Sequence, residues 1–159
     1  MHILLFLFWT SSSGIGYHSY PSVGVSLRSQ YIEASVYVSA SEKMAQHVRG
    51  GGEARVALCL PKLGKLLPEV GYRFAAQRLD EGTHTAQNPF LRLCYGKNSR
   101  ICGLYDFNDG TKYHLTAVRL DADIHIANRT YLMLAYERDM LRGHPAGEKA
   151  LFGVQMSVE

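Results

Sequence analysis

Three titratable side chains in one short stretch have the types and spacing for acid–base or metal chemistry. Asp121, Asp123 and His125 stand at every second position, a spacing that puts side chains on one face of a β-strand. A histidine beside carboxylates can act as a general base, or can hold a metal ion together with further ligands. The same spacing arises when charges alternate along a strand and pair with Arg119 and Arg129. We expect such a charge ladder and no metal site, because the ladder requires only the strand pattern.

The segment that positions these residues is predicted to be a β-hairpin over residues 113–139. If a three-residue loop joins its arms, Arg119 lies opposite Glu137 and Ile124 lies opposite Leu132, so that opposite charges meet and apolar side chains meet. A shift of one residue would place charged side chains against leucines. The pairing therefore predicts one charged face, made of Arg119, Asp121, Asp123, His125 and Glu137.

Alternation with a period of two recurs along most of the chain, and helical periodicity is nowhere sustained. We therefore predict an all-β fold of about eight to ten antiparallel strands, in an up-and-down β-barrel over residues 22–159. Residues 1–21 begin with the apolar run MHILLFLFW. This N-terminal segment fits a degenerate export signal, an additional strand or the start of a fragment, and the sequence leaves all three open.

Length and composition exclude several classes of protein. The chain has 159 residues, a size suited to one domain, and 47% of them are hydrophobic while 19% are charged. The formal charge of +3 is too small and too scattered to predict binding of nucleic acid. No apolar run reaches the roughly 18 residues that a membrane helix needs. A helical membrane protein is thus not expected.

Two of the three cysteines could form a disulfide. Cys94 and Cys102 flank a predicted tight turn at residues 96–99 symmetrically, so they could face each other across a hairpin in an oxidising compartment. Two unlinked thiols fit the spacing equally well. Cys59 has no evident partner, and the odd number of cysteines excludes a disulfide framework and a zinc site of standard spacing.

The predicted connections differ in length. Long loops are expected at residues 41–53, 80–89 and 140–148, and tight turns near Ser29 and at residues 96–99, 108–110 and 128–129. Long and short connections tend to alternate, which would collect the long ones on one rim, and only the turn at 108–110 breaks this order. His47, His84 and His144 lie in the long loops. They could meet at a metal site, but we expect scattered, solvated histidines.

The alternation does not say whether the apolar face meets a protein core or lipid. Several alternating segments reach the roughly 9–11 residues of a spanning strand, and the opposite face mixes charges of both signs that could pair inside a narrow lumen. The segments ADIHIANRTYLMLAYERD and GEKALFGVQMSVE resemble the closing hairpin and last strand of bacterial outer-membrane β-barrels. The resemblance covers about residues 22–159.

This resemblance implies a transmembrane barrel in the bacterial outer membrane, surrounded by membrane lipid. It implies a structural, adhesive or narrow-pore, porin-like role, with the three long loops at the outer rim, where they could meet lipopolysaccharide or an extracellular ligand. No cofactor is expected. The competing hypothesis is a secreted or periplasmic protein, a soluble lipocalin-like or sandwich fold that binds an apolar ligand.

An enzymatic hypothesis rests on His125. The lipid A deacylase family carries a His-x-Ser-Asn run on a late strand with an acidic residue further on, and His125, Ile126, Ala127 and Asn128 are similar to it. Ala127 stands where that family has its nucleophilic serine. Glu137 could supply the later acid, but an acid and a base without a nucleophile make no such hydrolase. We therefore expect that the protein is not an enzyme.

Overall fold

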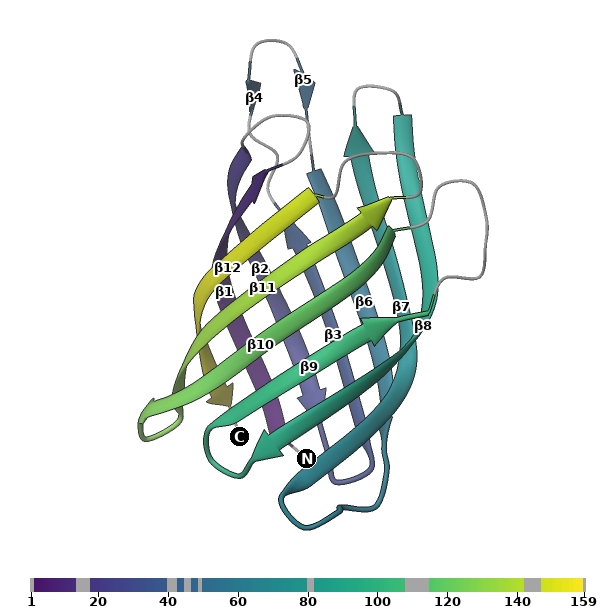
Figure 1. Ribbon diagram of the computed structural model, residues 1–159. Coiled ribbons are helices and arrows are strands. Elements are labelled where there is room, and N and C mark those ends of the chain that lie inside the picture. The colour runs from purple at the N-terminus through teal and green to yellow at the C-terminus, as the bar shows by residue number, and fades with distance from the viewer. Residues whose placement is uncertain are drawn as a thin grey trace.

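The computed structural model is a closed barrel of ten antiparallel strands within the described residues (Figure 1). It describes residues 2–13, 18–39, 43–44, 47–48, 50–79, 82–107, 115–141 and 147–158. The barrel strands are β1 (His2–Ser13), β2 (His18–Arg28), β3 (Ile32–Ser39), β6 (Gly50–Cys59), β7 (Leu66–Leu79), β8 (Gly82–Gly96), β9 (Arg100–Asp106), β10 (Leu115–Ala127), β11 (Thr130–Leu141) and β12 (Gly147–Val158). Two short strands, β4 (Lys43–Met44) and β5 (His47–Val48), pair only with each other. The predicted all-β barrel of about eight to ten strands is confirmed.

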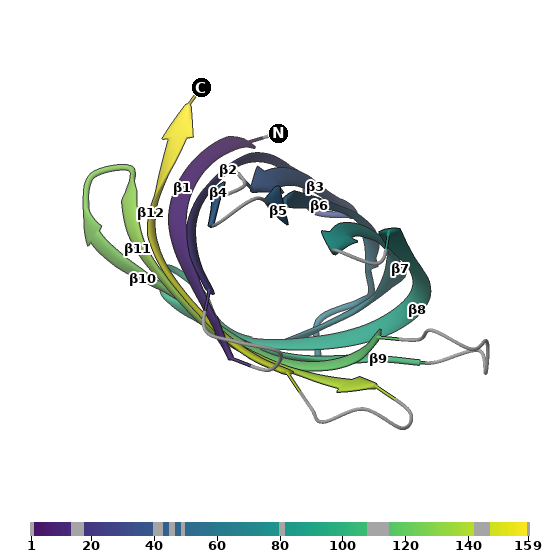
Figure 2. The same ribbon diagram turned by 90° about the horizontal axis from the view of Figure 1, so that it is seen from above.

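The barrel has an up-and-down order and is closed by its first and last strands. Each barrel strand pairs with its neighbours in the chain, and β12 pairs with β1, for example Met156 opposite Leu5. Seen from above, the strands surround a central lumen (Figure 2). Because β1 and the start of β2 belong to this wall, the barrel includes residues on the N-terminal side of position 22.

The predicted register of the β10–β11 hairpin is confirmed. Arg119 lies opposite Glu137 and Ile124 lies opposite Leu132. The turn itself is shorter than predicted, because Ala127 already pairs with Thr130 and a bulge between His125 and Ala127 takes up the difference. Asn128 adopts a φ of 40° in this turn, a left-handed conformation that asparagine tolerates better than most residues.

The long connections are shorter than predicted because strands extend into them. Residues 50–53 of the predicted loop 41–53 lie in β6, residues 82–89 of the loop 80–89 lie in β8, and residues 140–141 and 147–148 of the loop 140–148 lie in β11 and β12. The side chains there do not alternate in polarity. Backbone hydrogen bonds hold a strand without such alternation, as at Gly51, which pairs with both β3 and β7.

The prediction of a tight turn at residues 108–110 falls outside the described residues. The described register of β9 and β10 ends with Tyr105, which pairs with Val118, and β10 begins at Leu115. Figure 1 places the strand ends that border the long connections at one end of the barrel, and the short turns with both chain termini at the other.

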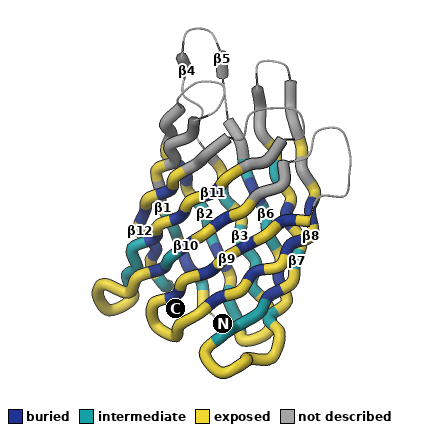
Figure 3. The backbone as a smooth tube through the Cα atoms, in the orientation of Figure 1, coloured by how far each residue is buried: buried dark blue, intermediate teal, exposed yellow. Residues whose placement is uncertain are grey.

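The apolar faces of the strands point outward and the charged faces point into the lumen. Along β10, Leu120 is 56% exposed, whereas Arg119 and Asp121 are 8% and 4% exposed. Buried and exposed positions alternate in this way along most of the barrel wall (Figure 3). An apolar exterior around a charged interior is the arrangement of a transmembrane barrel and the reverse of a soluble one. No helix in the described part of the chain is long and apolar enough to cross a membrane.

If the outer wall faces lipid, the loss of stability caused by a charged side chain there should depend on its depth in the bilayer. Leu120→Arg, in the middle of β10, is expected to lower the free energy of unfolding by about 2–4 kcal/mol, because it puts a cation near the bilayer midplane. Leu63→Arg, in the exposed β6–β7 turn, is the matched control and should cost about 0–1 kcal/mol. Urea titration of protein folded into phospholipid vesicles measures both. Equal costs at the two positions would contradict a lipid-facing β10.

Candidate functional site

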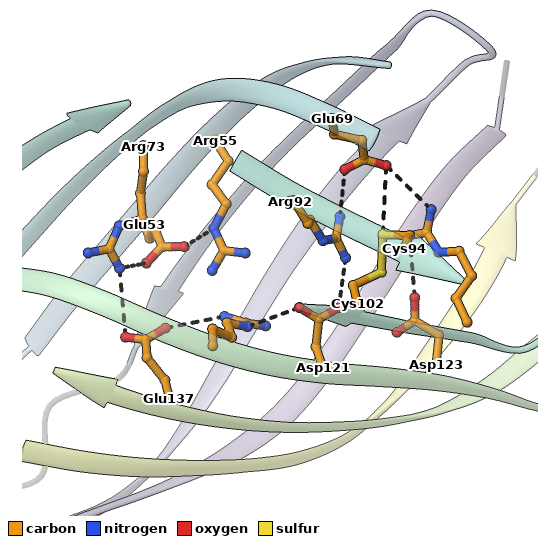
Figure 4. A network of polar contacts seen from close by, with 12 residues as sticks. Glu53, Arg55, Glu69, Arg73, Arg92, Cys94, Cys102, Asp121, Asp123 and Glu137 are labelled. Atoms are coloured by element: carbon orange, nitrogen blue, oxygen red, sulfur yellow. Dashed lines mark hydrogen bonds and ion pairs between the residues drawn. A yellow bond between two sulfur atoms is a disulfide. The ribbon is translucent and has the colours of Figure 1, made fainter. Parts of the chain in front are cut away.

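A network of ion pairs crosses the lumen and is the candidate functional site (Figure 4). Its side chains come from eight strands of the wall, β2, β3 and β6 to β11. The arginines are Arg28, Arg55, Arg73, Arg92, Arg100 and Arg119, and the carboxylates are Glu33, Glu53, Glu69, Asp106, Asp121, Asp123 and Glu137. Because both signs occur in similar numbers, most of the buried charge is compensated within the barrel.

Arg92 is the centre of the half of the network nearer the short turns. Its Nη1 lies 3.0 Å from Glu33 Oε1 and 3.2 Å from Glu69 Oε2, and its Nη2 lies 2.7 Å from Asp121 Oδ2. One guanidinium thereby joins β3, β7, β8 and β10. The planar fork of arginine carries several donors at fixed angles, which lysine could not supply.

Arg73 is the centre of the other half. Its Nη2 lies 2.7 Å from Asp106 Oδ2, and its Nη1 lies 3.2 Å from Glu53 Oε2 and 3.7 Å from Glu137 Oε1. Arg55 also pairs with Glu53. This half joins β6, β7, β9 and β11 across the lumen.

Arg119 connects the two halves. It lies 3.6 Å from Glu137 through Nη1 and 3.5 Å from Asp121 through Nε. The paired side chains thus form one continuous layer through the barrel, in a site where isolated charges would be costly.

The described interior also holds an apolar cluster and a small cavity beside the network. Met133, Ala135 and Leu151 pack together near β1, with Phe6 and Tyr37 against them. A cavity of about 70 Å³ lies between this cluster and residues such as Arg92 and Asp121. A buried water needs about 10–15 Å³, so the cavity has space for only a few water molecules.

A disulfide joins β8 to β9 inside the lumen. Cys94 pairs with Cys102 in the register of the two strands, and their sulfur atoms are bonded. Both residues are buried, and Cys94 Sγ lies 3.9 Å from Glu69 Oε1 in the network. Of the two alternatives that the spacing left open, the structure has the linked pair. Cys59 is a free thiol.

His125 takes part in none of the described ion pairs that join the other residues of the predicted charge ladder. Arg119, Asp121, Asp123 and Glu137 line the lumen, but His125 is exposed at the β10–β11 turn. Its Nε2 lies 2.7 Å from the carbonyl oxygen of Asn128, and its ring contacts that of Tyr131. His125 still pairs with Tyr131 in the regular register, and the bulge follows it, between His125 and Ala127.

Sequence patterning missed part of the network. Five further residues contribute ion pairs: Glu53, Glu69, Arg92, Arg100 and Asp106. Each stands on the polar face of an alternating segment, so that signal alone could have assigned it to the lumen. No three histidine, cysteine or acidic side chains gather as metal ligands among the described residues. The side chains of His47, His84 and His144 lie outside the described part of the chain.

Solved structures with this fold are outer-membrane proteins. The KdgM porin superposes with a TM-score of 0.59 at 11% identity, over 97% of this chain and 99% of that one. The chain has the fold of a bacterial outer-membrane β-barrel. The translocator domain of the autotransporter NalP from Neisseria meningitidis is also similar, with a TM-score of 0.50 and 11% identity over 98% of this chain and 87% of that one. No family model and no curated protein sequence matches. At 11% sequence identity, the similarity of this chain to these two proteins shows the fold alone.

The central position of Arg92 predicts a large effect of its removal. Arg92→Ala should lower the free energy of unfolding by about 3–5 kcal/mol, because it leaves buried carboxylates without their cation. Arg138→Ala, at an exposed position of β11, is the control and should change stability by less than about 0.5 kcal/mol. Urea titration in vesicles measures both. An Arg92→Ala protein as stable as the wild type would show that the network does not hold the barrel together.

The disulfide predicts how many cysteines an alkylating reagent can label before and after reduction. Alkylation of the unfolded, unreduced protein should add one label, at Cys59, and alkylation after reduction should label all three cysteines. Mass spectrometry of the intact chain counts the labels, and Cys59→Ser should remove the first one. Three labels without reductant would contradict the bond between Cys94 and Cys102.

Proposed function

We propose that this protein is an occluded outer-membrane barrel with a structural or adhesive role, a rigid membrane anchor for the connections at its long-loop rim. The observation that carries the proposal is the layer of ion pairs that crosses the lumen, beside which lie an apolar cluster and a cavity of about 70 Å³. In a small barrel, side chains that fill the interior leave no diffusion path for solutes.

The strands support a display role at the long-loop rim. β7 and β8 have 14 and 15 residues, whereas a tilted strand needs only about 9–11 to cross the hydrocarbon core. Their hairpin therefore extends several residues beyond the bilayer, on the side of the long connections (Figure 1). In outer-membrane barrels this side is extracellular. Lipopolysaccharide or an extracellular ligand is the partner that the proposal assigns to it.

A narrow pore is the second candidate, favoured by the cavity. Its lining includes Arg28, Arg55, Arg92 and Arg119 together with Asp121 and other carboxylates, so water and small ions could enter if the network rearranged. The name of the similar KdgM porin describes a pore, which supports this candidate through the shared fold only.

An enzymatic role is not part of the proposal. His125 and Glu137 are separated along the hairpin by six positions, or about 20 Å at the usual rise of a strand. One is exposed at the turn and the other is buried in the lumen. Ala127, close to His125, has no hydroxyl at the position where the lipid A deacylase family has its nucleophilic serine.

Conductance distinguishes an occluded barrel from a pore. The wild type in a planar lipid bilayer is expected to give no stable open channel, whereas the double variant Arg92→Ser and Arg119→Ser should conduct, because it removes two guanidinium groups that block the lumen. Arg138→Ser is the control and should stay closed. Stable wild-type channels of porin size would refute occlusion and favour the pore. A double variant that inserts but stays closed would show that these arginines do not block the lumen.

A further inference from the structure

The short turns form a hydrogen-bonded rim around one end of the barrel. The Cys59 N–H donates to the Tyr31 carbonyl at 2.7 Å, and the Gly96 N–H donates to the Lys65 carbonyl at 3.4 Å. The His125 N–H donates to Ser99 Oγ at 3.1 Å, and the Ser157 N–H donates to the Arg129 carbonyl at 2.9 Å. Each short turn is thereby tied to the next strand along the wall. The rim therefore presents its side chains from a fixed backbone.

The exposed charges of this rim are basic. Lys62 and Lys65 lie in the β6–β7 turn, Lys97 lies in the β8–β9 turn, and all three are exposed. None of the three lysines pairs with a carboxylate among the described residues. The described short-turn residues, 29–31, 60–65, 97–99 and 128–129, include no aspartate or glutamate, and the nearby Glu69 and Asp123 are buried in the lumen. The described short turns of this rim thus carry an excess of positive charge.

Exposed apolar side chains lie among these lysines. Leu63, between Lys62 and Lys65, is 67% exposed, and Tyr31 is equally exposed. Gly64, with a φ of 66°, makes the tight turn that lets Leu63 and Leu66 exchange backbone hydrogen bonds and keeps Leu63 at its tip. From this turn, exposed apolar side chains extend through Leu60 to Leu58, which lies on the outer face of β6. The rim is therefore continuous with the lipid-facing wall.

We propose that this rim binds the headgroups of anionic phospholipids in the leaflet on the short-turn side. Ammonium groups at the edge of an apolar belt lie at the depth of lipid phosphates. Leu63 and Tyr31 then contact the glycerol and upper acyl region, as amphipathic side chains do at membrane interfaces. The inference rests on the proposed membrane location, and it assigns the short-turn rim a preference for lipids with net negative charge over zwitterionic ones.

Continuity with the apolar wall favours lipid over a protein partner as the occupant. A protein bound at the rim would have to approach along the barrel axis, whereas lipid already surrounds β6 up to Leu60. The attraction is electrostatic at an exposed site, so it should weaken as salt screens it.

The test is the relative association of spin-labelled phosphatidylglycerol and spin-labelled phosphatidylcholine with the folded protein in phosphatidylcholine bilayers. We expect several-fold selectivity for phosphatidylglycerol at low salt, since each lysine near an anionic lipid surface contributes roughly a fivefold preference at most. The triple variant Lys62→Gln, Lys65→Gln and Lys97→Gln should lose the selectivity, as should the wild type in 1 M salt. Arg138→Gln, at the opposite end of β11 from the short turn, is the matched control and should keep it.

The outcomes separate this inference from the proposed function. A protein that does not insert into the bilayer refutes the membrane barrel itself. A protein that inserts but shows no selectivity, or a triple variant that keeps the wild-type selectivity, refutes the lipid-binding rim and leaves the occluded barrel intact. A loss in Arg138→Gln equal to that in the triple variant would assign the effect to net charge and would overturn the inference as well.

Discussion

The whole structure depends on the pairing of charges inside the barrel. The strands carry charged residues on one face and apolar residues on the other, so closing the sheet must enclose one of the two sets. Enclosing the charges is favourable only where each has a partner, because an unpaired buried charge is costly. Arg92 and Arg73 meet this condition with three carboxylates each. The apolar wall, the filled lumen and the location in lipid all follow from this pairing.

Apolar side chains occupy part of the interior beside the charge network. The ion pairs join β2, β3 and β6 to β11, whereas Met133, Ala135 and Leu151 form one buried apolar cluster near β1. A second buried apolar cluster is made of Ala57, Phe90 and Leu104. A cavity of about 70 Å³ lies between the first cluster and the charged side chains.

Sequence patterning could predict the alternation but not its environment. The register of β10 and β11 followed from Arg119 and Glu137, since local pairing chemistry determines it. Arg92, in contrast, meets Glu33 from a position 59 residues away, and a contact of that range leaves no local signal. His125 shares the spacing of Asp121 and Asp123, but it lies at the β10–β11 turn, is exposed and has no described ion pair, because the strand ends there. The strand at Gly50–Cys59 begins earlier than expected because backbone pairing, and not side-chain polarity, sustains it.

Trp9 reports most directly on whether the apolar face of this barrel contacts lipid. It is the single tryptophan of the sequence and is exposed on β1, so its fluorescence has one source. In vesicles that contain lipids brominated on the acyl chain, a lipid-facing outer wall predicts strong quenching of Trp9 fluorescence by the lipid and weak quenching by aqueous iodide. Strong quenching by iodide with none by brominated lipid would contradict a lipid-facing outer wall.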